Sequence, residues 1–404
     1  MDEAVPFARP FTGKEEEEAV IKVLRSGWLT TGSECLAFEK EFAEFLESKK
    51  KSNSAEKTAC LAVNSATSGL HLALEACGVG PGDLVLLPSY TFTASAEVIR
   101  YLGADPVFVD VAPGTFHLDP KALEKTLEKL PPDKAKAVMP VHFGGLPCDM
   151  EAILSIAGKY GLKTVEDAAH SLPSPLPASP HVPEGTFAGA SGDIGVFSFY
   201  VTKTMTTGEG GMIAVRDMEL AKRMSIMRSH GIDRSIWNRY TDTGASWYYE
   251  VVAPGFKYNL PDLLAALGRV QLGRIFELLS QREAIAGKYD EAFAGDGHFI
   301  IPPSGMGDAR HLYPLRINPQ KLRISRNEFI EKLKEQGIGV SVHFIPLHTM
   351  PYYKTRYNLK DEDFPESLSS FESEISLPIW PGMSGSMIEK VITVVKSLGM
   401  KYTK

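Results

Sequence analysis

Three groups of residues in the first half of the chain have types and spacing suited to chemistry. The first is the segment 64–69, Asn-Ser-Ala-Thr-Ser-Gly, which stands directly before a helical pattern that begins at Leu70. Small hydroxyl residues at the start of a helix leave backbone N–H groups available, and such a helix start can bind an anion such as phosphate. The alternative, an ordinary N-cap without a ligand, stays open at this point.

The second group is a pair of acids, and the third is a lysine. Glu166 and Asp167 follow the apolar residues Thr164-Val165, so they stand at the end of an expected strand, where open α/β sheets bind their ligands. Lys203 lies between the apolar run 196–199 and a glycine-rich turn at 208–211. A lysine that is partly removed from water has a lowered pKa and can act as a nucleophile. Taken singly, a structural carboxylate and an exposed loop lysine remain alternatives.

The order of these groups along the chain points to one cofactor. Pyridoxal phosphate needs an anion cradle for its phosphate, a carboxylate that keeps its pyridine nitrogen protonated, and a lysine for its aldehyde. The sequence supplies a phosphate-type helix start, then Asp167 about 100 residues later, then Lys203. The combination therefore predicts a pyridoxal phosphate enzyme.

The elements that must position these residues alternate along the chain. Apolar runs separated by helical patterns predict a mostly parallel sheet covered on both faces by helices. The expected strands are at 84–87, 107–109, 137–141, 164–165, 196–199 and 212–215. The segment 171–189 has four prolines between Pro173 and Pro180, which excludes a regular helix there and leaves a lid, an insertion or a surface loop.

The pattern of expected helices and strands changes after about residue 273. A long charged helix is expected at 274–294, followed by a strand at 311–317, a helix at 326–336, a strand at 340–344 and a terminal helix at 386–398. We therefore expect a large domain over residues 1–273 and a smaller α+β domain over residues 274–404.

Composition excludes several classes of protein. The 404 residues carry 43 Lys and Arg against 50 Asp and Glu, a formal charge of −7, which is not the basic footprint of a nucleic-acid binder. No apolar run approaches a membrane span, and the acidic N-terminus has no signal-peptide core. The four cysteines (Cys35, Cys60, Cys77 and Cys148) form no CxxC pair. These features predict a cytoplasmic protein without a protein-bound metal.

Several motifs together resemble a known family, the DegT/StrS-type nucleotide-sugar aminotransferases of fold type I. The resemblance covers nearly the whole chain, and the joint order and spacing of the motifs make it specific. The matching segments are 26–32 (SGWLTTG), 88–94 (PSYTFTA), 140–144 (PVHFG), 166–170 (EDAAH), 198–211, 230–231 (HG), 255–260 (GFKYNL) and 341–348 (SVHFIPLH). The resemblance implies a large domain with a mixed, mostly parallel seven-stranded sheet and a homodimer with shared active sites.

The resemblance also implies roles for individual residues. Lys203 would form the Schiff base with pyridoxal phosphate and then carry the proton between substrate and cofactor, while Asp167 would pair with the pyridine nitrogen. Phe92 would stack on the ring. The remaining cofactor contacts implied by the family are Ala66, Thr67 and Ser198 at the phosphate and His170 near the 3-hydroxyl group.

One segment departs from the common family pattern. Many relatives have Asn-Tyr-Arg where this chain has Lys257-Tyr258-Asn259. In the family this segment reaches the phosphate in the partner subunit, so either Lys257 or Asn259 would do so here. The Lys-Tyr-Asn form resembles the branch that acts on 4-keto sugars. Candidate substrate contacts are Trp28, Thr30, Tyr313 and His343, because the family places their segments around the sugar.

The expected reaction is a ping-pong transfer of an amino group from L-glutamate to a nucleotide-linked keto-sugar, with pyridoxamine phosphate as the intermediate form of the cofactor. A related dehydratase branch has histidine in place of the lysine, so Lys203 favours amino transfer. Two alternatives stay open: a different pyridoxal phosphate reaction such as sugar dehydration, and a non-catalytic regulator or binding protein on the same fold. The nucleotide, the sugar, the aminated carbon and the role of the loop at 172–184 stay undetermined.

Overall fold

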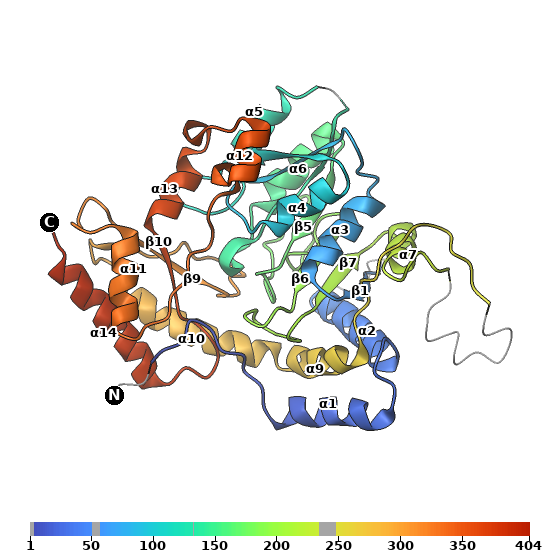
Figure 1. Cartoon of the computed structure of the whole chain (residues 1–404), viewed down its shortest axis with the longest axis horizontal. Helices are drawn as coiled ribbons and strands as arrows, with labels where there is room; N and C mark the ends of the chain where they lie inside the picture. The colour runs from blue at the N-terminus through green and yellow to red at the C-terminus, as the bar shows by residue number, and fades with distance from the viewer. Residues whose placement is uncertain (1–3, 51–56, 132, 234–247) are drawn as a thin grey trace.

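The computed structural model describes residues 4–50, 57–131, 133–233 and 248–404. It has a seven-stranded sheet between layers of helices and a three-stranded antiparallel sheet in its C-terminal part (Figure 1). In spatial order the large sheet consists of β1 (Ala59–Val63), β7 (Gly211–Val215), β6 (Ile194–Ser198), β5 (Lys163–Asp167), β4 (Ala135–Val138), β2 (Leu84–Pro88) and β3 (Asp105–Val109). The predicted α/β fold class is confirmed.

The large sheet is mixed because of one strand. β7 runs antiparallel to both of its neighbours, β1 and β6, whereas the remaining pairs are parallel. Alternate residues of each strand face the two helical layers: on β1, Leu61 and Val63 enter one core, and Cys60 and Ala62 enter the other. The sequence did not predict β1, because its Ala-Cys-Leu-Ala-Val stretch is short and contains few residues that favour strands.

Helices cover both faces of the sheet (Figure 1). The core on one face contains side chains of α3 (Ala66–Ala76), α4 (Ala94–Tyr101) and α7 (Met218–Met227). The opposite face packs against α2 (Ser33–Glu47) and α9 (Asp262–Gly273), with α5 (Pro120–Leu127) and α6 (Met150–Tyr160) covering β2, β3 and β4. α1 (Lys14–Ser26) lies against α9. Among the helices that the structure describes, none is long and apolar enough to cross a membrane.

The smaller sheet has its own apolar core. Its strands are β10 (Glu374–Leu377), β9 (Tyr313–Ile317) and β8 (Phe299–Ile300), in that order, and they pack with α10 (Ile275–Phe293), α11 (Arg326–Glu335) and α14 (Gly385–Lys401). Val5, from the other end of the chain, belongs to the same core. The expected strand at 340–344 is wrong: only Ser341 pairs there, as an isolated bridge with Ser376. The backbone just before it, at Gly337 and Gly339, is hydrogen-bonded to Val5 instead.

The C-terminal part also contacts the large sheet. Leu347, Tyr353 and Phe364 belong to the core that contains α3 and α4. They come from the short helices η2 (Leu347–Thr349) and α12 (Pro351–Tyr357) and from the residue before α13 (Pro365–Ser373); two further single turns are η1 (Phe143–Gly145) and η3 (Asp361–Asp363). The division into domains at residue 273 stays a prediction.

Strand direction explains where the chemical groups meet. β1 is antiparallel to β7, which is antiparallel to β6, so β1, β5 and β6 all run the same way. Their carboxyl ends therefore lie at one edge of the sheet. α3 begins three residues after β1, Asp167 is the last residue of β5, and Lys203 follows the end of β6 by five residues.

Candidate active site

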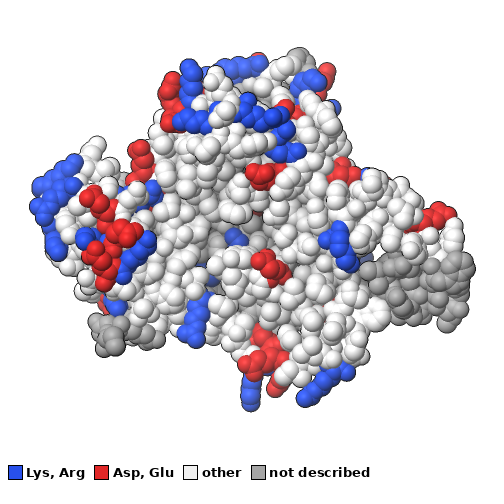
Figure 2. All heavy atoms as spheres, in the orientation of Figure 1, with Lys and Arg blue, Asp and Glu red and all other residues white. Residues whose placement is uncertain are grey.

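A cavity of about 420 Å³ opens at this edge of the large sheet. The face drawn in Figure 2 is hollowed near its centre, and most of the surface around the hollow is uncharged. The wall formed by the large sheet includes Ser65, Ala66, Thr67, Phe92, Asp167, His170, Ser198 and Lys203, and the opposite wall includes His311, His343 and Phe344. The structure thus brings most of the sequence-predicted residues together.

Asp167 and its neighbour Glu166 show how the end of β5 separates two carboxylates. Successive strand residues point to opposite faces, and Glu166 is fully buried on the face away from the cavity. There it accepts hydrogen bonds from His142 Nε2 at 2.9 Å and from the backbone N–H groups of residues 189, 191 and 192 at 2.6–2.8 Å. Burial opposes its ionisation, but these donors lower the pKa of Glu166 below its ordinary value. Glu166 therefore has a structural role.

Asp167 has fewer partners and faces the cavity. Its carboxylate accepts a 2.9 Å hydrogen bond from Ser95 Oγ and a 3.1 Å bond from the backbone N–H of Ala169. Burial raises the pKa of Asp167, against the lowering effects of Ser95, Ala169 and Lys203. When hydrogen bonds do not offset the cost of removing a carboxylate from water, a nearby cation stabilises its charged form. A protonated ring nitrogen bound in the cavity would provide that cation.

Lys203 lies in the cavity wall, and its surroundings favour the neutral amine. Removal from water lowers the pKa of Lys203 to about 8; Asp167 opposes this shift, and the buried Arg282 adds to it. An amine with this pKa is partly unprotonated near neutral pH, so it can attack a carbonyl carbon and can also accept and return a proton.

The start of α3 forms the anion-binding end of the cavity. Ser65 is the N-cap, and its hydroxyl accepts a 3.1 Å hydrogen bond from the N–H of Ser68. The N–H groups of the first helical residues, Ala66 and Thr67, have no partner within the helix. Ser198, at the end of β6, lines the same region. Free N–H groups and hydroxyls at a helix N-terminus suit a phosphate.

A histidine pair forms another part of the wall. His170 Nδ1 accepts a 3.2 Å hydrogen bond from the N–H of Gly144, so Nε2 carries the proton of the neutral ring. Its ring centroid lies 4.5 Å from that of His311. Burial, with Lys203 nearby, lowers the pKa of both histidines. Both rings are therefore neutral near physiological pH and can donate or accept hydrogen bonds without adding charge.

Sequence reasoning missed several residues of the site. Ser95, which holds Asp167, is 72 positions away from it along the chain, so no local pattern links them. His311 and Phe344 line the cavity from the C-terminal part. Phe344 directly follows His343 in the motif at 341–348, so that motif contains a signal for it.

Five of the predicted residues are not among those lining the cavity in the described part of this chain. Tyr313 is fully buried in the smaller core, where its hydroxyl donates to Asp290 Oδ1 at 2.9 Å. Asn259 Nδ2 donates to Thr31 Oγ1 at 2.6 Å, and Lys257 is exposed. The remaining two, Trp28 and Thr30, lie in the segment between α1 and α2, and Trp28 Nε1 donates to the carbonyl of Thr31 at 3.2 Å.

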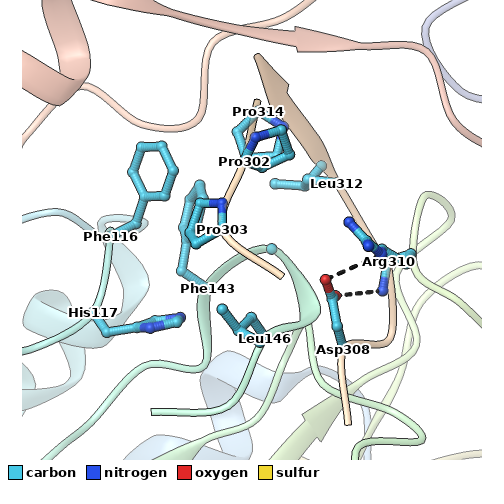
Figure 3. Close-up of a pocket in the computed structure, with 11 residues that line it drawn as sticks. Phe116, His117, Phe143, Leu146, Pro302, Pro303, Asp308, Arg310, Leu312 and Pro314 are labelled. Atoms are coloured by element: carbon cyan, nitrogen blue, oxygen red, sulfur yellow. Dashed lines mark hydrogen bonds and ion pairs between the residues drawn. The ribbon is translucent and has the colours of Figure 1, made fainter. Parts of the chain in front are cut away.

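A second cavity lies between the two parts of the chain and is too small for a substrate. Figure 3 shows Phe116, His117 and Phe143 facing Pro302 and Pro303, with the Arg310–Asp308 ion pair at one side. Its volume of about 20 Å³ has room for a single water. This cavity is therefore a small gap between packed side chains.

The donor set of the large cavity fits pyridoxal phosphate. Asp167 suits a protonated ring nitrogen, the start of α3 suits a phosphate, and Lys203 suits an aldehyde. Phe92 is 56% exposed at the rim, and its ring centroid lies 5.7 Å from that of Phe344, so it presents an apolar face to a ring bound there.

Comparison with known proteins agrees with this geometry. The sequence pattern of the DegT/DnrJ/EryC1/StrS aminotransferase family matches residues 10–396, and the chain belongs to this family. Spore coat polysaccharide biosynthesis protein SpsC of Bacillus subtilis is 42% identical over 398 residues, which cover 98% of this chain and 97% of that protein.

Solved structures extend the similarity to sugar aminotransferases. The putative sugar aminotransferase Spr1654 of Streptococcus pneumoniae, in its PMP form, superposes with a TM-score of 0.87 at 31% identity, covering 98% of this chain and 99% of that chain. Its PLP form gives 0.86 at 30% identity, covering 99% of each chain. Helicobacter pylori PseC, an aminotransferase involved in pseudoaminic acid biosynthesis, gives 0.86 at 27% identity, covering 99% and 100%. The chain is accordingly a sugar aminotransferase whose cofactor is pyridoxal phosphate.

Proposed function

We propose that this enzyme transfers an amino group from L-glutamate to a nucleotide-linked 4-keto sugar and so makes an amino sugar for a surface polysaccharide or glycan. The observation that carries the proposal is the shared cavity of Lys203 and Asp167 at the carboxyl ends of β5 and β6. The Lys-Tyr-Asn segment at 257–259 supports the 4-keto choice. The names of SpsC and PseC place those relatives in the biosynthesis of spore coat polysaccharide and of pseudoaminic acid, which supports the pathway.

Each sequence-predicted residue of the sheet wall has a defined task in this proposal. Asp167 holds the protonated ring nitrogen, Phe92 packs on the ring face, and His170 hydrogen-bonds near the 3-hydroxyl. Ala66, Thr67 and Ser198 hold the phosphate. When bound, pyridoxal phosphate supplies an electron-withdrawing ring next to the reacting carbon. Lys203 Nζ accepts the proton from the carbon of the amino donor and returns a proton to the carbon of the sugar.

The remaining predicted residues act at the edge of the cavity. His343 lines it and contacts the sugar in this proposal. We assign Trp28 and Thr30 to the same substrate region, and Lys257 or Asn259 to the phosphate of a second subunit in a homodimer. The exposed side chain of Lys257 is available for such a contact, whereas Asn259 is committed to Thr31. This difference favours Lys257.

The test follows the two half-reactions separately. The purified protein is loaded with pyridoxal phosphate, and its absorbance is recorded before and after L-glutamate. We expect the visible band to shift in the wild type and the Lys159→Ala control, whose lysine pairs with Glu124 on the surface, but not in Lys203→Ala. A panel of 4-keto and 3-keto sugars linked to UDP, GDP or dTDP then identifies the acceptor by mass spectrometry. If glutamate converts the bound cofactor to its pyridoxamine form but no 4-keto sugar is aminated, the proposed substrate is wrong.

A further inference from the structure

Behind His343, a buried serine and a buried glutamate extend away from the cavity. His343 Nδ1 lies 2.8 Å from Ser376 Oγ, and Ser376 Oγ is hydrogen-bonded in turn to Glu374 Oε1. The second oxygen of Glu374, Oε2, accepts a 3.0 Å hydrogen bond from the backbone N–H of His343. Ser376 and Glu374 are fully buried. The three side chains therefore form a continuous hydrogen-bonded path from the protein interior to the cavity.

Several contacts hold His343 and its ring in place. Ser341 and Ser376 exchange two backbone hydrogen bonds, of 3.2 and 2.9 Å, which hold the 341–343 segment beside β10. The Tyr90 hydroxyl donates to the carbonyl of His343 at 2.8 Å, and the Phe7 ring stacks on the imidazole with centroids 5.5 Å apart. Nδ1 is thus committed to Ser376. Nε2 makes no hydrogen bond to a described residue, and it is the nitrogen available to a molecule in the cavity.

Two proton arrangements satisfy the same heavy-atom positions. If Glu374 is ionised, Ser376 donates to it, His343 Nδ1–H donates to Ser376, and Nε2 presents a lone pair to the cavity. If Glu374 is protonated, it donates to Ser376, Ser376 donates to Nδ1, and Nε2 carries the hydrogen. The imidazole is neutral in both arrangements, and only its tautomer differs.

We propose that Glu374, Ser376 and His343 form a proton relay that lets His343 Nε2 give a proton to, or take one from, an oxygen of the keto-sugar. The inference rests on the proposed function for its substrate. Within that function it assigns to Glu374 and Ser376 a positioning role that acts through His343.

The proton balance of the relay is simple. When Nε2 gives its proton to the sugar oxygen, Nδ1 takes the proton of Ser376 Oγ, and Oγ takes the proton of Glu374, which becomes a carboxylate. The carbonyl oxygen of a ketone leaves as water when nitrogen replaces it, so it must gain two protons, and the attacking amine must lose two. Nε2 then takes one proton from the attacking amine, and the same steps in reverse reload Glu374. A second round of the same transfers moves the second proton from the amine to the oxygen.

The surroundings make a neutral relay favourable. Burial raises the pKa of Glu374 to about 8, although Ser376, the backbone N–H of His343 and Arg326 all lower it. Burial, with Lys203 nearby, lowers the pKa of His343 to about 4, so an imidazolium is disfavoured. The charged and titratable groups around the path are Arg326 on α11, Arg316 opposite Glu374 on β9, Tyr90 after β2, and Lys203, His170 and His311 across the cavity.

The direct test observes the His343 tautomer in the full-length protein, with and without cofactor. The side-chain nitrogens of ¹⁵N-histidine are followed by NMR from pH 6 to pH 10, and His343→Gln assigns the signal. We expect Nε2 to carry the hydrogen at low pH and Nδ1 to carry it at high pH, with a midpoint near the Glu374 pKa of about 8. A His343 tautomer that stays the same over this range overturns the relay.

Glu374→Gln gives a sharper expectation. The backbone N–H of His343 requires an acceptor, so the amide oxygen must take the place of Oε2 and the NH₂ group must face Ser376. Ser376 then donates to Nδ1, which locks the hydrogen on Nε2 at every pH. The exposed Glu372→Gln, two positions earlier, is the matched control and should keep the pH-dependent switch. A switch that persists in Glu374→Gln contradicts the proposal.

Kinetics then separates the relay from a structural role. Ser376→Ala should slow the keto-sugar half-reaction about 100-fold, the effect of losing a general acid, and leave the glutamate half-reaction unchanged. Ser373→Ala, which removes a buried hydroxyl that bonds only helix carbonyls, is its control. Equal slowing of both half-reactions overturns the assignment to the sugar oxygen. If no keto-sugar is turned over at all, the proposed function fails, and the NMR titration still decides whether the proton path exists.

Discussion

The two walls of the cavity are built in different ways. The sheet wall uses strand ends and a helix start, with Asp167 ending β5 and α3 beginning three residues after β1, so backbone hydrogen bonds set the positions of its groups. The opposite wall uses loop residues, His311 and His343. Arg282 donates a hydrogen bond to the backbone carbonyl of His311, and Ser376 is hydrogen-bonded to the ring of His343. A fixed cofactor requires the first kind of support. In the proposed relay, the second kind allows His343 to exchange one neutral tautomer for the other without moving.

The largest effect should come from the sheet wall. Lys203→Ala should reduce amino transfer by at least about 1000-fold, because the nucleophile and the acid-base group are lost together. The measurement is single-turnover transfer of ¹⁵N from labelled glutamate to the sugar. Lys203→Arg is the matched variant, because it keeps a positive charge near Asp167 but cannot act as a neutral amine near pH 7. Substantial transfer by either variant would show that another group moves the proton.

A second prediction distinguishes two neighbouring carboxylates of the same wall. In Glu166→Gln, the new NH₂ group faces two N–H donors and leaves them unpaired, so we expect a loss of about 2–4 kcal/mol in the free energy of unfolding. In Asp167→Asn, the NH₂ group can face the Ser95 hydroxyl, which can accept. This variant should stay folded and lose amino transfer by about 100-fold or more. Denaturant unfolding and single-turnover rates measure the two effects.

The pH dependence of stability should differ in sign between the two carboxylates. The pKa of Glu166 is below its ordinary value, so its contribution is present above that value and is lost as the pH falls through the lowered pKa. The pKa of Asp167 is raised, so its ionisation opposes folding increasingly as the pH rises above its ordinary value. In the cofactor-free protein, Asp167→Asn should therefore gain stability relative to wild type between pH 4 and pH 7, and Glu166→Gln should lose it. The same trend in both variants would contradict the assigned environments.

The sheet wall was also the wall that the sequence predicted well. Continuous apolar runs such as 84–87 mark buried parallel strands, and the motifs that end the strands carry Asp167 and Lys203 within a few residues of them. The opposite wall depends on contacts between distant positions. Glu374 and His343 are 31 residues apart, and the backbone beside residue 338 pairs with Val5 from the other end of the chain. Local periodicity contains no information on such pairings, so it predicted a strand at 340–344 that did not form.

A smaller effect should come from Tyr313, which resemblance placed at the sugar and the structure places in the smaller core. Tyr313→Phe removes a hydrogen bond to Asp290, so we expect a loss of about 1 kcal/mol in the free energy of unfolding and an unchanged KM for the keto-sugar. Tyr289→Phe loses a hydroxyl bond to the carbonyl of Pro378 in the same core and should behave alike. If Tyr313→Phe raised the KM for the keto-sugar and Tyr289→Phe did not, Tyr313 would belong to the substrate site after all.

The smallest effect should come from the N-terminal segment, which packs against His343 in the opposite wall. The Phe7 ring stacks on His343, and such a ring contact contributes about 0.5–1.5 kcal/mol. Phe7→Leu keeps an apolar side chain but removes the flat contact, so the KM for the keto-sugar should rise a few-fold while the glutamate half-reaction is unchanged. Phe11→Leu, in the same segment, loses a contact with Arg274 instead and should leave both half-reactions unchanged. If Phe7→Leu impaired the glutamate half-reaction to the same degree as the keto-sugar half-reaction, the opposite wall would serve both substrates. The two walls would then differ only in how they are built.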